Sequence, residues 1–396
     1  MIDHRKLGRE LELFHGDPLV GSGLPIWLPA GAAARHAVEE YIREQERLEG
    51  YQHVYSPPVA KREMYQRSGH LAKFGEDMFP GMPDGEGEAD DLMLRPSMCP
   101  HHAMVFASRG RSYRELPLRI AELGGQYRAE RSGVVGGLSR VRAMWLNDAH
   151  IFCRLDQVGD EVASVLRLMR RAHAALGFEP HRFRLSLRGN NILGGPEVWD
   201  LAEDMLRDAL IKQDIPFEEA EGEAAFYGPK IDVQVLDSAG REWSLATVQV
   251  DFAQPERFGL HYVDQHGQRQ RPVMVHRSII GSLERLFAHL IEVHEGAFPA
   301  WYAPIQLAVL PVSEAQDARC RQLAADALCA GLRVEVLADG SLSARIRDAA
   351  KRKIPYVAVI GAREAESGRV ALRQRGGAEL PLMSVEEAIK LIPRQP

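Results

Sequence analysis

Residues 273–294 read Val-Met-Val-His-Arg-Ser-Ile-Ile-Gly-Ser-Leu-Glu-Arg-Leu-Phe-Ala-His-Leu-Ile-Glu-Val-His. The apolar run Val273–His276 predicts a strand. From Ser282 to His294 apolar residues recur every three or four positions, which predicts a helix. Its inward face would carry Leu283, Leu286, Leu290 and Ile291. A buried strand followed by an amphipathic helix fits a mixed fold of helices and strands.

The upstream sequence contains both helical and strand patterns. We expect helices over 32–48, 157–176 and 197–212, strands over 231–236 and 247–252, a strand over 51–59 broken by Pro57-Pro58, and an acidic Gly/Pro-rich loop over 80–91. Short strands among helices predict an α+β domain with a mainly antiparallel sheet, which we assign to residues 1–302.

From Pro304 onward, strands alternate with helices. The expected strands are 305–310, 334–337, 356–360 and 370–373, and the expected helices are 314–330, 343–352 and 385–391. This alternation predicts a small α/β domain over residues 303–396.

The composition limits the class of protein. The chain has 396 residues, 45% of them hydrophobic, which suits two or three domains. No apolar run approaches the roughly 18 residues of a membrane span, and the N-terminus lacks the apolar core of a signal peptide. Four irregularly spaced cysteines fit a reducing cytoplasm. With a net charge of −6, any nucleic-acid contact must come from local basic patches.

Three motifs follow one another in order. They are the helix–strand unit ending at Pro57-Pro58, then Tyr127-Arg128-Ala129-Glu130 with a loop to Arg140-Val141-Arg142, then Gly281-Ser282-Leu283-Glu284-Arg285. The flanking words include Asp3-His4-Arg5-Lys6-Leu7-Gly8, Asp148-Ala149-His150-Ile151-Phe152-Cys153 and Ala225-Phe226-Tyr227-Gly228-Pro229-Lys230. Together they resemble motifs 1, 2 and 3 of the class II aminoacyl-tRNA synthetases and, within that class, the threonyl-tRNA synthetases. The resemblance covers nearly the whole chain and implies a class II catalytic domain followed by an anticodon-binding domain.

The resemblance implies an ATP site. Arg128 would hold the α-phosphate bidentately and stabilise charge during nucleotidyl transfer, and Glu130 would accept a hydrogen bond from the adenine amino group. Arg285 would stack on adenine or reach the γ-phosphate. Further ATP contacts are implied at Arg140, Met144 and Gln249, with Mg²⁺ on the phosphates. The residues alone leave another interpretation open, in which Arg128 and Glu130 pair across a strand and Arg285 is a solvated charge.

Cys99, His150 and His276 are the implied metal ligands. One thiolate and two imidazoles form a three-ligand zinc set that leaves a fourth position for a substrate. No two of them are close in sequence, so this set depends on the resemblance. Without it, a buried cysteine and two hydrogen-bonded core histidines are the better interpretation. In the family the metal takes the amino and hydroxyl groups of threonine, and a site built for a hydroxyl rejects valine by roughly 10⁴ or more.

Further roles follow from the same resemblance. Asp148 and Tyr227 would bind the substrate hydroxyl and amino groups, and His70 would be the base that assists the acceptor ribose. From composition alone, Asp148 could instead cap a helix, Tyr227 could be a core ring and His70 a surface residue. Lys230 would be a phosphate contact, which places it with Arg128, Arg285 and His70 among the implied catalytic residues. The other interpretation of Lys230 is a solvated charge. Base-reading positions for the anticodon match Glu366, Arg373 and Arg375.

Several pocket positions depart from the family pattern: Gly136, Met144, Leu146, Asn147, Ser244 and Leu245. They put the amino-acid choice or the inhibitor sensitivity in question. The chain begins where the catalytic domain of full-length relatives begins, so we expect a short form without the N-terminal and editing domains. Serine lacks only one methyl group of threonine, so we expect measurable serine activation.

These implications predict a cytoplasmic, homodimeric enzyme, a threonine–tRNA ligase that joins threonine to tRNA(Thr) through a threonyl-adenylate. One alternative is a paralogue with altered amino-acid or inhibitor specificity, which amino-acid-dependent pyrophosphate exchange would reveal. The other is a catalytically inactive tRNA-binding regulator, which an ATP turnover assay would reveal.

Overall fold

The structure, a computed structural model, describes residues 2–85, 87, 91–190, 192–193 and 195–396. Residues 86 and 88–90 of the expected acidic loop lie outside the described residues. By internal contacts the chain divides into a first unit of residues 16–25 and 42–289 and a second unit of residues 2–15, 26–41 and 290–396. The expected domain boundary after residue 302 stays a prediction.

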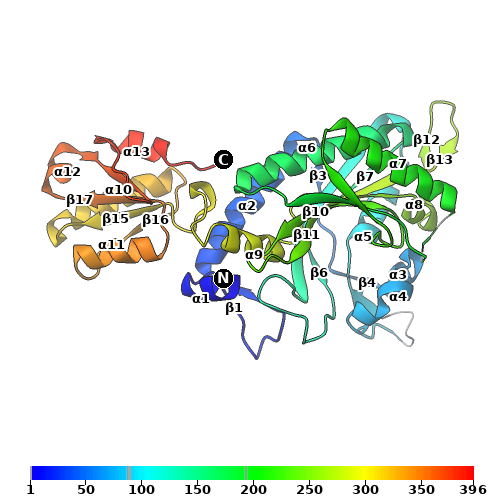
Figure 1. Cartoon of the computed structure of the whole chain (residues 1–396), viewed down its shortest axis with the longest axis horizontal. Coiled ribbons are helices and arrows are strands. Elements are labelled where there is room, and N and C mark those ends of the chain that lie inside the picture. The colour runs from blue at the N-terminus through cyan, green and yellow to red at the C-terminus, as the bar shows by residue number, and fades with distance from the viewer. Residues whose placement is uncertain (1, 86, 88–90, 191, 194) are drawn as a thin grey trace. The chain divides into compact units, whose positions relative to one another are not determined.

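An eight-stranded sheet forms the centre of the first unit (Figure 1). In spatial order its strands are β3 (Gln52–His53), β6 (Leu118–Tyr127), β7 (Ala143–Cys153), β14 (Val273–Ser278), β11 (Glu242–Asp251), β10 (Lys230–Leu236), β8 (Arg182–Ser186) and β9 (Phe217–Ala220). Only the outermost pairs, β3 with β6 and β8 with β9, are parallel. The mainly antiparallel sheet that the sequence predicts is therefore confirmed.

Helices accompany the sheet on both faces. The helices of the first unit are α3 (Arg62–Ser68), α4 (His70–Phe74), α5 (Cys99–Ala107), α6 (Val158–Leu176), α7 (Pro196–Lys212) and α8 (Ala253–Arg257), together with residues 42–48 of α2 (Pro29–Leu48) and 283–289 of α9 (Leu283–Val293). α6 and α7 lie against β10, β11 and β14 (Figure 1). α6 buries Val158, Val162, Val165 and Met169 at helical spacing. It ends at Gly177, whose φ of +84° closes the last turn.

The opposite face of this sheet is lined with polar side chains. His150 lies opposite His276, His276 opposite Gln249, Gln249 opposite Lys230, and Lys230 opposite Ser186. Paired residues of neighbouring strands project from the same face, so these residues form one row across five strands. A step of two positions along each strand returns to the same face, and the residues reached in this way are Asp148, Ser278, Thr247 and Asp232. Such a buried polar face is what a binding site requires.

The predicted strand over 51–59 is only partly correct. β3 ends at His53, and the Ser56 N–H donates to the Glu122 carboxylate at 3.2 Å instead of continuing the ladder. The two prolines that follow have no N–H to donate. The chain then forms β4 (Val59–Lys61), which pairs with β5 (Leu92–Leu94). A second small antiparallel pair consists of β12 (Tyr262–Val263) and β13 (Arg269–Gln270).

The second unit contains a four-stranded sheet. Its strands, in spatial order, are β16 (Val334–Val336), β15 (Leu307–Pro311), β17 (Tyr356–Ile360) and β19 (Leu372–Gln374). Its other elements are α1 (His4–Glu10), β1 (Phe14–His15), β2 (Ile26–Trp27), α10 (Asp317–Cys329), α11 (Leu342–Lys351), α12 (Ala362–Ser367), β18 (Arg369–Val370), β20 (Met383–Ser384) and α13 (Val385–Leu391).

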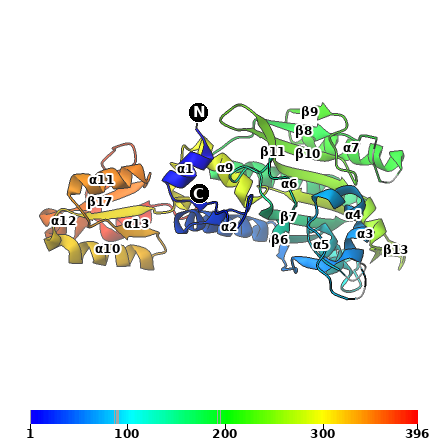
Figure 2. The same ribbon diagram turned by 90° about the horizontal axis from the view of Figure 1, so that it is seen from below.

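Alternation along β15 builds two cores in this unit. Leu307 and Val309 pack in a cluster with α10 and α13, whereas Ala308 and Leu310 pack with α11 on the other face (Figure 2). β15 lies between the parallel strands β16 and β17 and is buried along its whole length. The small α/β domain that the sequence predicts is confirmed. Among the described residues, no helix has the length and apolar character to cross a bilayer.

Candidate active site

Cys99, His150 and His276 converge on the polar face of the large sheet. All three are buried, and their potential ligand atoms lie within 4.8 Å of one another. Register brings the histidines together, since β7 and β14 place them directly opposite each other, with His150 Nε2 2.9 Å from His276 Nδ1. Cys99 comes from the first turn of α5. The structure thus unites three residues that are far apart in sequence, in a set of donors typical of zinc.

The ring nitrogens that point away from this cluster have hydrogen-bond partners outside it. His150 Nδ1 lies 2.7 Å from His102 Nδ1, and His102 Nε2 lies 3.2 Å from the Glu122 carboxylate. His276 Nε2 lies 2.8 Å from Asp251 Oδ2. Metal-bound histidines commonly have such outer partners. His102, Glu122 and Asp251 were not predicted from the sequence. The signal for His102 was its position three residues after Cys99, which places both on one side of α5.

The predicted substrate residues border the cluster. Asp148 lies two residues before His150 on β7, and burial raises the pKa of its carboxyl group. The Tyr227 ring centroid lies 5.1 Å from that of His276. His70 is buried rather than on the surface, with Nδ1 2.8 Å from Ser68 Oγ and Nε2 3.7 Å from Cys99 Sγ. Asp148, Tyr227 and His70 are therefore all adjacent to the three candidate ligands.

Arg128, Arg140 and Arg285 bring positive charge to the same region. Burial, and then the charges of Arg128 and Arg140, lower the pKa of Arg285 to about 10. Arg140 pairs with Glu130 at 2.8 Å, and Arg285 lies 5.7 Å from the Trp243 ring centroid. Clustered guanidinium groups without an equal number of carboxylates are suited to a polyphosphate.

A glycine allows the third motif to approach the sheet. Gly281 has a φ of +68°, and a Cβ atom at this position would lie 2.2 Å from the Leu245 carbonyl oxygen. Only glycine fits such a site without strain. The chain turns here, and α9 begins at Leu283, so that Arg285 projects from the first turn of the helix. The expected helix over 282–294 is confirmed within one residue at each end.

Gln249 and Lys230 are both held by neighbouring protein groups. The Gln249 amide donates to the Gly228 carbonyl at 2.6 Å, which braces the turn that carries Tyr227. Lys230 Nζ pairs with Asp232 at 2.7 Å. Met144 is half-buried on β7, opposite Gln126. On this face, Gln126 Oε1, Thr247 Oγ1 and Ser278 Oγ are buried and find no hydrogen-bond partner in the described part of the chain. Buried polar atoms of this kind call for a ligand or water.

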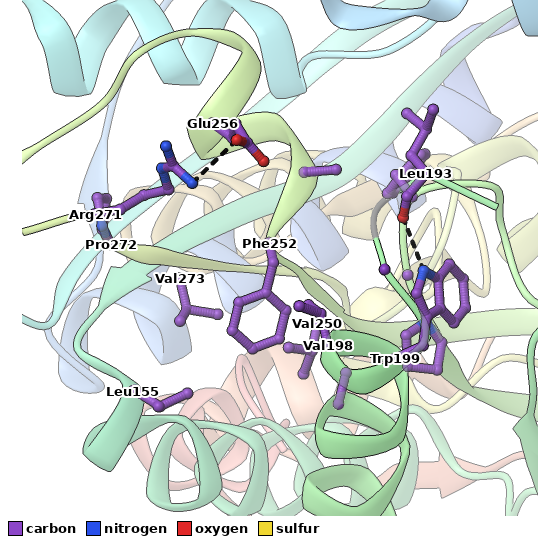
Figure 3. Close-up of a pocket in the computed structure, with 16 residues that line it drawn as sticks. Leu155, Leu193, Val198, Trp199, Val250, Phe252, Glu256, Arg271, Pro272 and Val273 are labelled. Carbon is purple, nitrogen blue, oxygen red and sulfur yellow. Dashed lines mark hydrogen bonds and ion pairs between the residues drawn. The ribbon is translucent and has the colours of Figure 1, made fainter.

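An apolar cavity of about 270 Å³ has Tyr227 in its lining. Figure 3 shows other residues that line this cavity. Val250, Phe252, Val198 and Trp199 line it, and an ion pair between Glu256 and Arg271 lies at its edge. Val250 follows Gln249 on β11 and therefore projects from the opposite, helix-covered face of the sheet. The cavity is thus separate from the polar site, although Tyr227 borders both.

The predicted anticodon residues lie in the second unit. Glu366 and Arg373 are exposed, and Arg373 pairs with Glu379 at 2.5 Å. Arg375 differs, because its guanidinium donates to the carbonyls of Lys353 at 2.7 Å and Phe298 at 2.8 Å. Arg375 is also exposed, but these two bonds anchor its guanidinium to the backbone, so the geometry of Arg375 favours a structural role.

Residues 84–294 match the family described as tRNA synthetase class II core domain (G, H, P, S and T), and residues 306–395 match the anticodon binding domain. A crystal structure of the RNA binding domain of threonyl-tRNA synthetase from Cryptosporidium parvum is 34% identical, with a TM-score of 0.92. The alignment covers 98% of this chain and 97% of that one. The chain belongs to the threonyl-tRNA synthetase family.

Two bacterial members of the family are more similar in sequence. Threonine–tRNA ligase of Halalkalibacterium halodurans is 46% identical over 99% of this chain, and threonine–tRNA ligase 1 of Bacillus subtilis is 46% identical over 98%. The chain spans 61% of the length of each of these relatives. The predicted class II catalytic fold with an anticodon-binding domain is confirmed.

The structure separates the positions that depart from the threonyl-tRNA synthetase pattern. Asn147 does not face the site, since it lies between Leu146 and Asp148 on the strand and projects from the other face. Its amide donates to Glu46 at 2.7 Å and accepts from Arg277 at 3.2 Å. Leu146 lies on the same face as Asp148. Asn147 is therefore part of a buried network behind the site, not a pocket residue.

Proposed function

We propose that this chain activates threonine with ATP and transfers the threonyl group to tRNA(Thr). The observation that carries the proposal is the convergence of Cys99, His150 and His276 beside Asp148 and Tyr227, next to a cluster of arginines. In the first step the threonine carboxylate attacks the α-phosphorus of ATP and pyrophosphate leaves. In the second step a ribose hydroxyl of the tRNA 3′ end attacks the adenylate carbonyl and AMP leaves.

Cys99, His150 and His276 would hold one Zn²⁺, which supplies coordination positions for the amino and hydroxyl groups of threonine. The fit rests on the donor set, on its burial and on the outer hydrogen bonds of both imidazoles. Asp148 accepts a hydrogen bond from the substrate hydroxyl, and Tyr227 contacts the amino group. Valine offers a methyl group to the same polar surroundings and leaves them unpaired, so the site rejects it.

Arg128 holds the α-phosphate and stabilises the charge that develops on it, while Arg285 neutralises the phosphate chain. Glu130 and Arg140 pair with each other before ATP binds, and ATP replaces this pairing by contacts to the base and phosphates. Mg²⁺ accompanies the nucleotide. Met144 packs on the adenine, and Gln249 and Lys230 contact ATP, Lys230 at a phosphate. ATP would compete there with the contacts that Gln249 makes to the Gly228 carbonyl and Lys230 to Asp232. His70 would be the group that assists the ribose hydroxyl, because it is buried beside Cys99. Burial lowers the pKa of its imidazole to about 3, so the neutral ring would accept a hydrogen bond from the hydroxyl and would hold its proton only weakly.

We also propose that two copies associate through the first motif. Leu48 at the end of α2 and Tyr55 beyond the short edge strand β3 are both exposed, which is unusual for large apolar side chains near a sheet edge. A two-fold interface would cover them.

The four free cysteines, three of them buried, fit an enzyme that works in the cytoplasm. Residues 1–302 would form the catalytic domain and 303–396 the domain that reads the anticodon through Glu366 and Arg373.

Amino-acid-dependent pyrophosphate exchange tests the proposal. We expect exchange with threonine, weaker exchange with serine by roughly 10- to 200-fold, and none measurable with valine. Arg128→Lys keeps the charge but loses the bidentate fork, and we expect it to slow exchange by about 10²-fold or more. The panel also separates the alternatives, since a paralogue would prefer another amino acid and an inactive regulator would support no exchange. Either result would overturn the proposal.

A further inference from the structure

Each candidate histidine ligand faces the cluster with a different ring nitrogen. His150 presents Nε2 and His276 presents Nδ1, and these two atoms lie 2.9 Å apart. A neutral imidazole has one protonated nitrogen and one lone pair, and only the lone pair can bind a metal. Both histidines therefore need their protons on the outer nitrogens, which are Nδ1 of His150 and Nε2 of His276.

Asp251 determines which ring nitrogen of His276 carries the proton. Its Oδ1 accepts the backbone N–H groups of Ala253 at 2.7 Å and Gln254 at 2.9 Å, at the start of α8. Oδ2 is thereby directed at His276 Nε2, 2.8 Å away. An ionised carboxylate only accepts hydrogen bonds, so Nε2 must carry the proton and Nδ1 must carry the lone pair.

Glu122 determines which ring nitrogen of His150 carries the proton, and it acts through His102. Glu122 is held by Ser56 Oγ at 2.6 Å and by Arg95 at 3.1 Å, and it lies 3.2 Å from His102 Nε2. Burial opposes its ionisation, but the hydrogen bonds from His102 and Ser56 and the charge of Arg95 lower its pKa to about 2. His102 therefore donates from Nε2 and accepts at Nδ1, where His150 Nδ1 lies 2.7 Å away. His150 must then be the donor, which leaves its Nε2 as a lone pair.

We propose that Asp251 and the Glu122–His102 pair are positioning residues that fix the tautomers of the two ligands, so that His276 binds the metal through Nδ1 and His150 through Nε2. The inference rests on the proposed zinc site. It adds a reason why the chain keeps buried polar groups behind a three-residue cluster, because without them each histidine would populate the tautomer that presents an N–H to the metal.

Asp251→Asn, made in the 396-residue protein, tests the hydrogen bond that fixes the tautomer of His276. The amide keeps the size of the side chain, and its oxygen can still accept the two N–H groups of α8. Its nitrogen would then donate to His276 Nε2, which places the proton on Nδ1. We expect zinc affinity, measured by competition with a chelator, to fall at least 10- to 100-fold, while the thermal unfolding of the zinc-free protein changes little.

His102→Asn and His102→Leu form a matched pair of variants. They test the hydrogen bonds that run from Glu122 through His102 to His150. Both lose the contact with Glu122, but only asparagine keeps an acceptor near the position of Nδ1. We expect His102→Asn to bind zinc within a few-fold of the wild type and His102→Leu to bind at least tenfold more weakly. The absorption bands of the Co²⁺-substituted protein should match the wild type in His102→Asn and differ in His102→Leu.

The outcomes separate the two proposals. Equal zinc affinity in the wild type, Asp251→Asn and His102→Leu would overturn the tautomer assignment while the zinc site stands. Equal losses in His102→Asn and His102→Leu would also overturn it, because the loss would then come from packing. A wild-type protein that binds no zinc would overturn the zinc site itself.

Discussion

The Nε2 atom of His150 lies 2.9 Å from the Nδ1 atom of His276, although 126 residues separate them in the chain. The register of β7 and β14 alone produces this approach, since the two residues are direct partners. A slip of one residue would turn one ring to the opposite face of the sheet. The candidate site therefore depends on the strand pairing that the core behind it stabilises.

Arg277 behind the sheet is expected to be essential for that core. It is fully buried, pairs with Glu46 at 2.8 Å and lies 4.2 Å from the Tyr51 ring centroid. Arg277→Met leaves the buried Glu46 without its main counter-charge, so we expect the free energy of unfolding to fall by about 3–5 kcal/mol. Urea denaturation measures the change. Arg241→Met, which breaks an exposed pair with Asp237, should cost less than about 1 kcal/mol. Equal effects of the two variants would contradict the assignment.

His173 should make the first unit less stable in acid. It is buried at the end of α6, donates from Nε2 to the Ile279 carbonyl at 2.7 Å, and burial lowers its pKa to about 4. In the unfolded chain, His173 has an ordinary pKa of about 6.5 and binds a proton below that pH. In the folded chain, its imidazole stays neutral until the pH falls to about 4. Stability is therefore lost as the pH falls between these values, by up to about 1.4 kcal/mol per pH unit.

His173→Gln keeps a donor and removes the titration. Its unfolding free energy, measured in urea from pH 6.5 to pH 4, should fall less steeply than that of the wild type. His266→Gln, at an exposed position, serves as the control and should retain the wild-type slope. A slope that is the same in His173→Gln and in the wild type would show that His173 is not the group responsible.

Much of the fold could be predicted from local patterns, whereas the site could not. Val385–Leu391 was predicted to the residue, and the structure shows a capping box of Ser384 and Glu387 at its start. β6 and β7 were not predicted as strands, since their inward faces carry Glu122, Gln126, Asp148 and His150 and break the apolar alternation. These polar residues are the ones that form the site. Without the resemblance to known synthetases, periodicity would have found the core and missed the chemistry.

Arg373 and Arg375 are expected to differ, although the sequence predicts the same role for both. Arg375→Ala removes two hydrogen bonds to backbone carbonyls, so it should lower the thermal stability and change the KM for tRNA little. Arg373→Ala removes an exposed guanidinium, so it should leave stability unchanged and raise the KM for tRNA about tenfold. Aminoacylation and thermal unfolding of both variants measure the effects. A larger KM effect in Arg375→Ala would restore it as a base-reading residue.

In the proposed mechanism, a zinc ion on Cys99, His150 and His276 selects threonine. This role is tested by threonine-dependent pyrophosphate exchange on the purified protein, with zinc content measured in the same samples before and after chelation and after zinc is restored. We predict about one zinc per chain, loss of exchange in step with loss of zinc, and recovery of both on reloading. Full threonine-dependent exchange in protein that contains no zinc would show that the metal does not select the substrate.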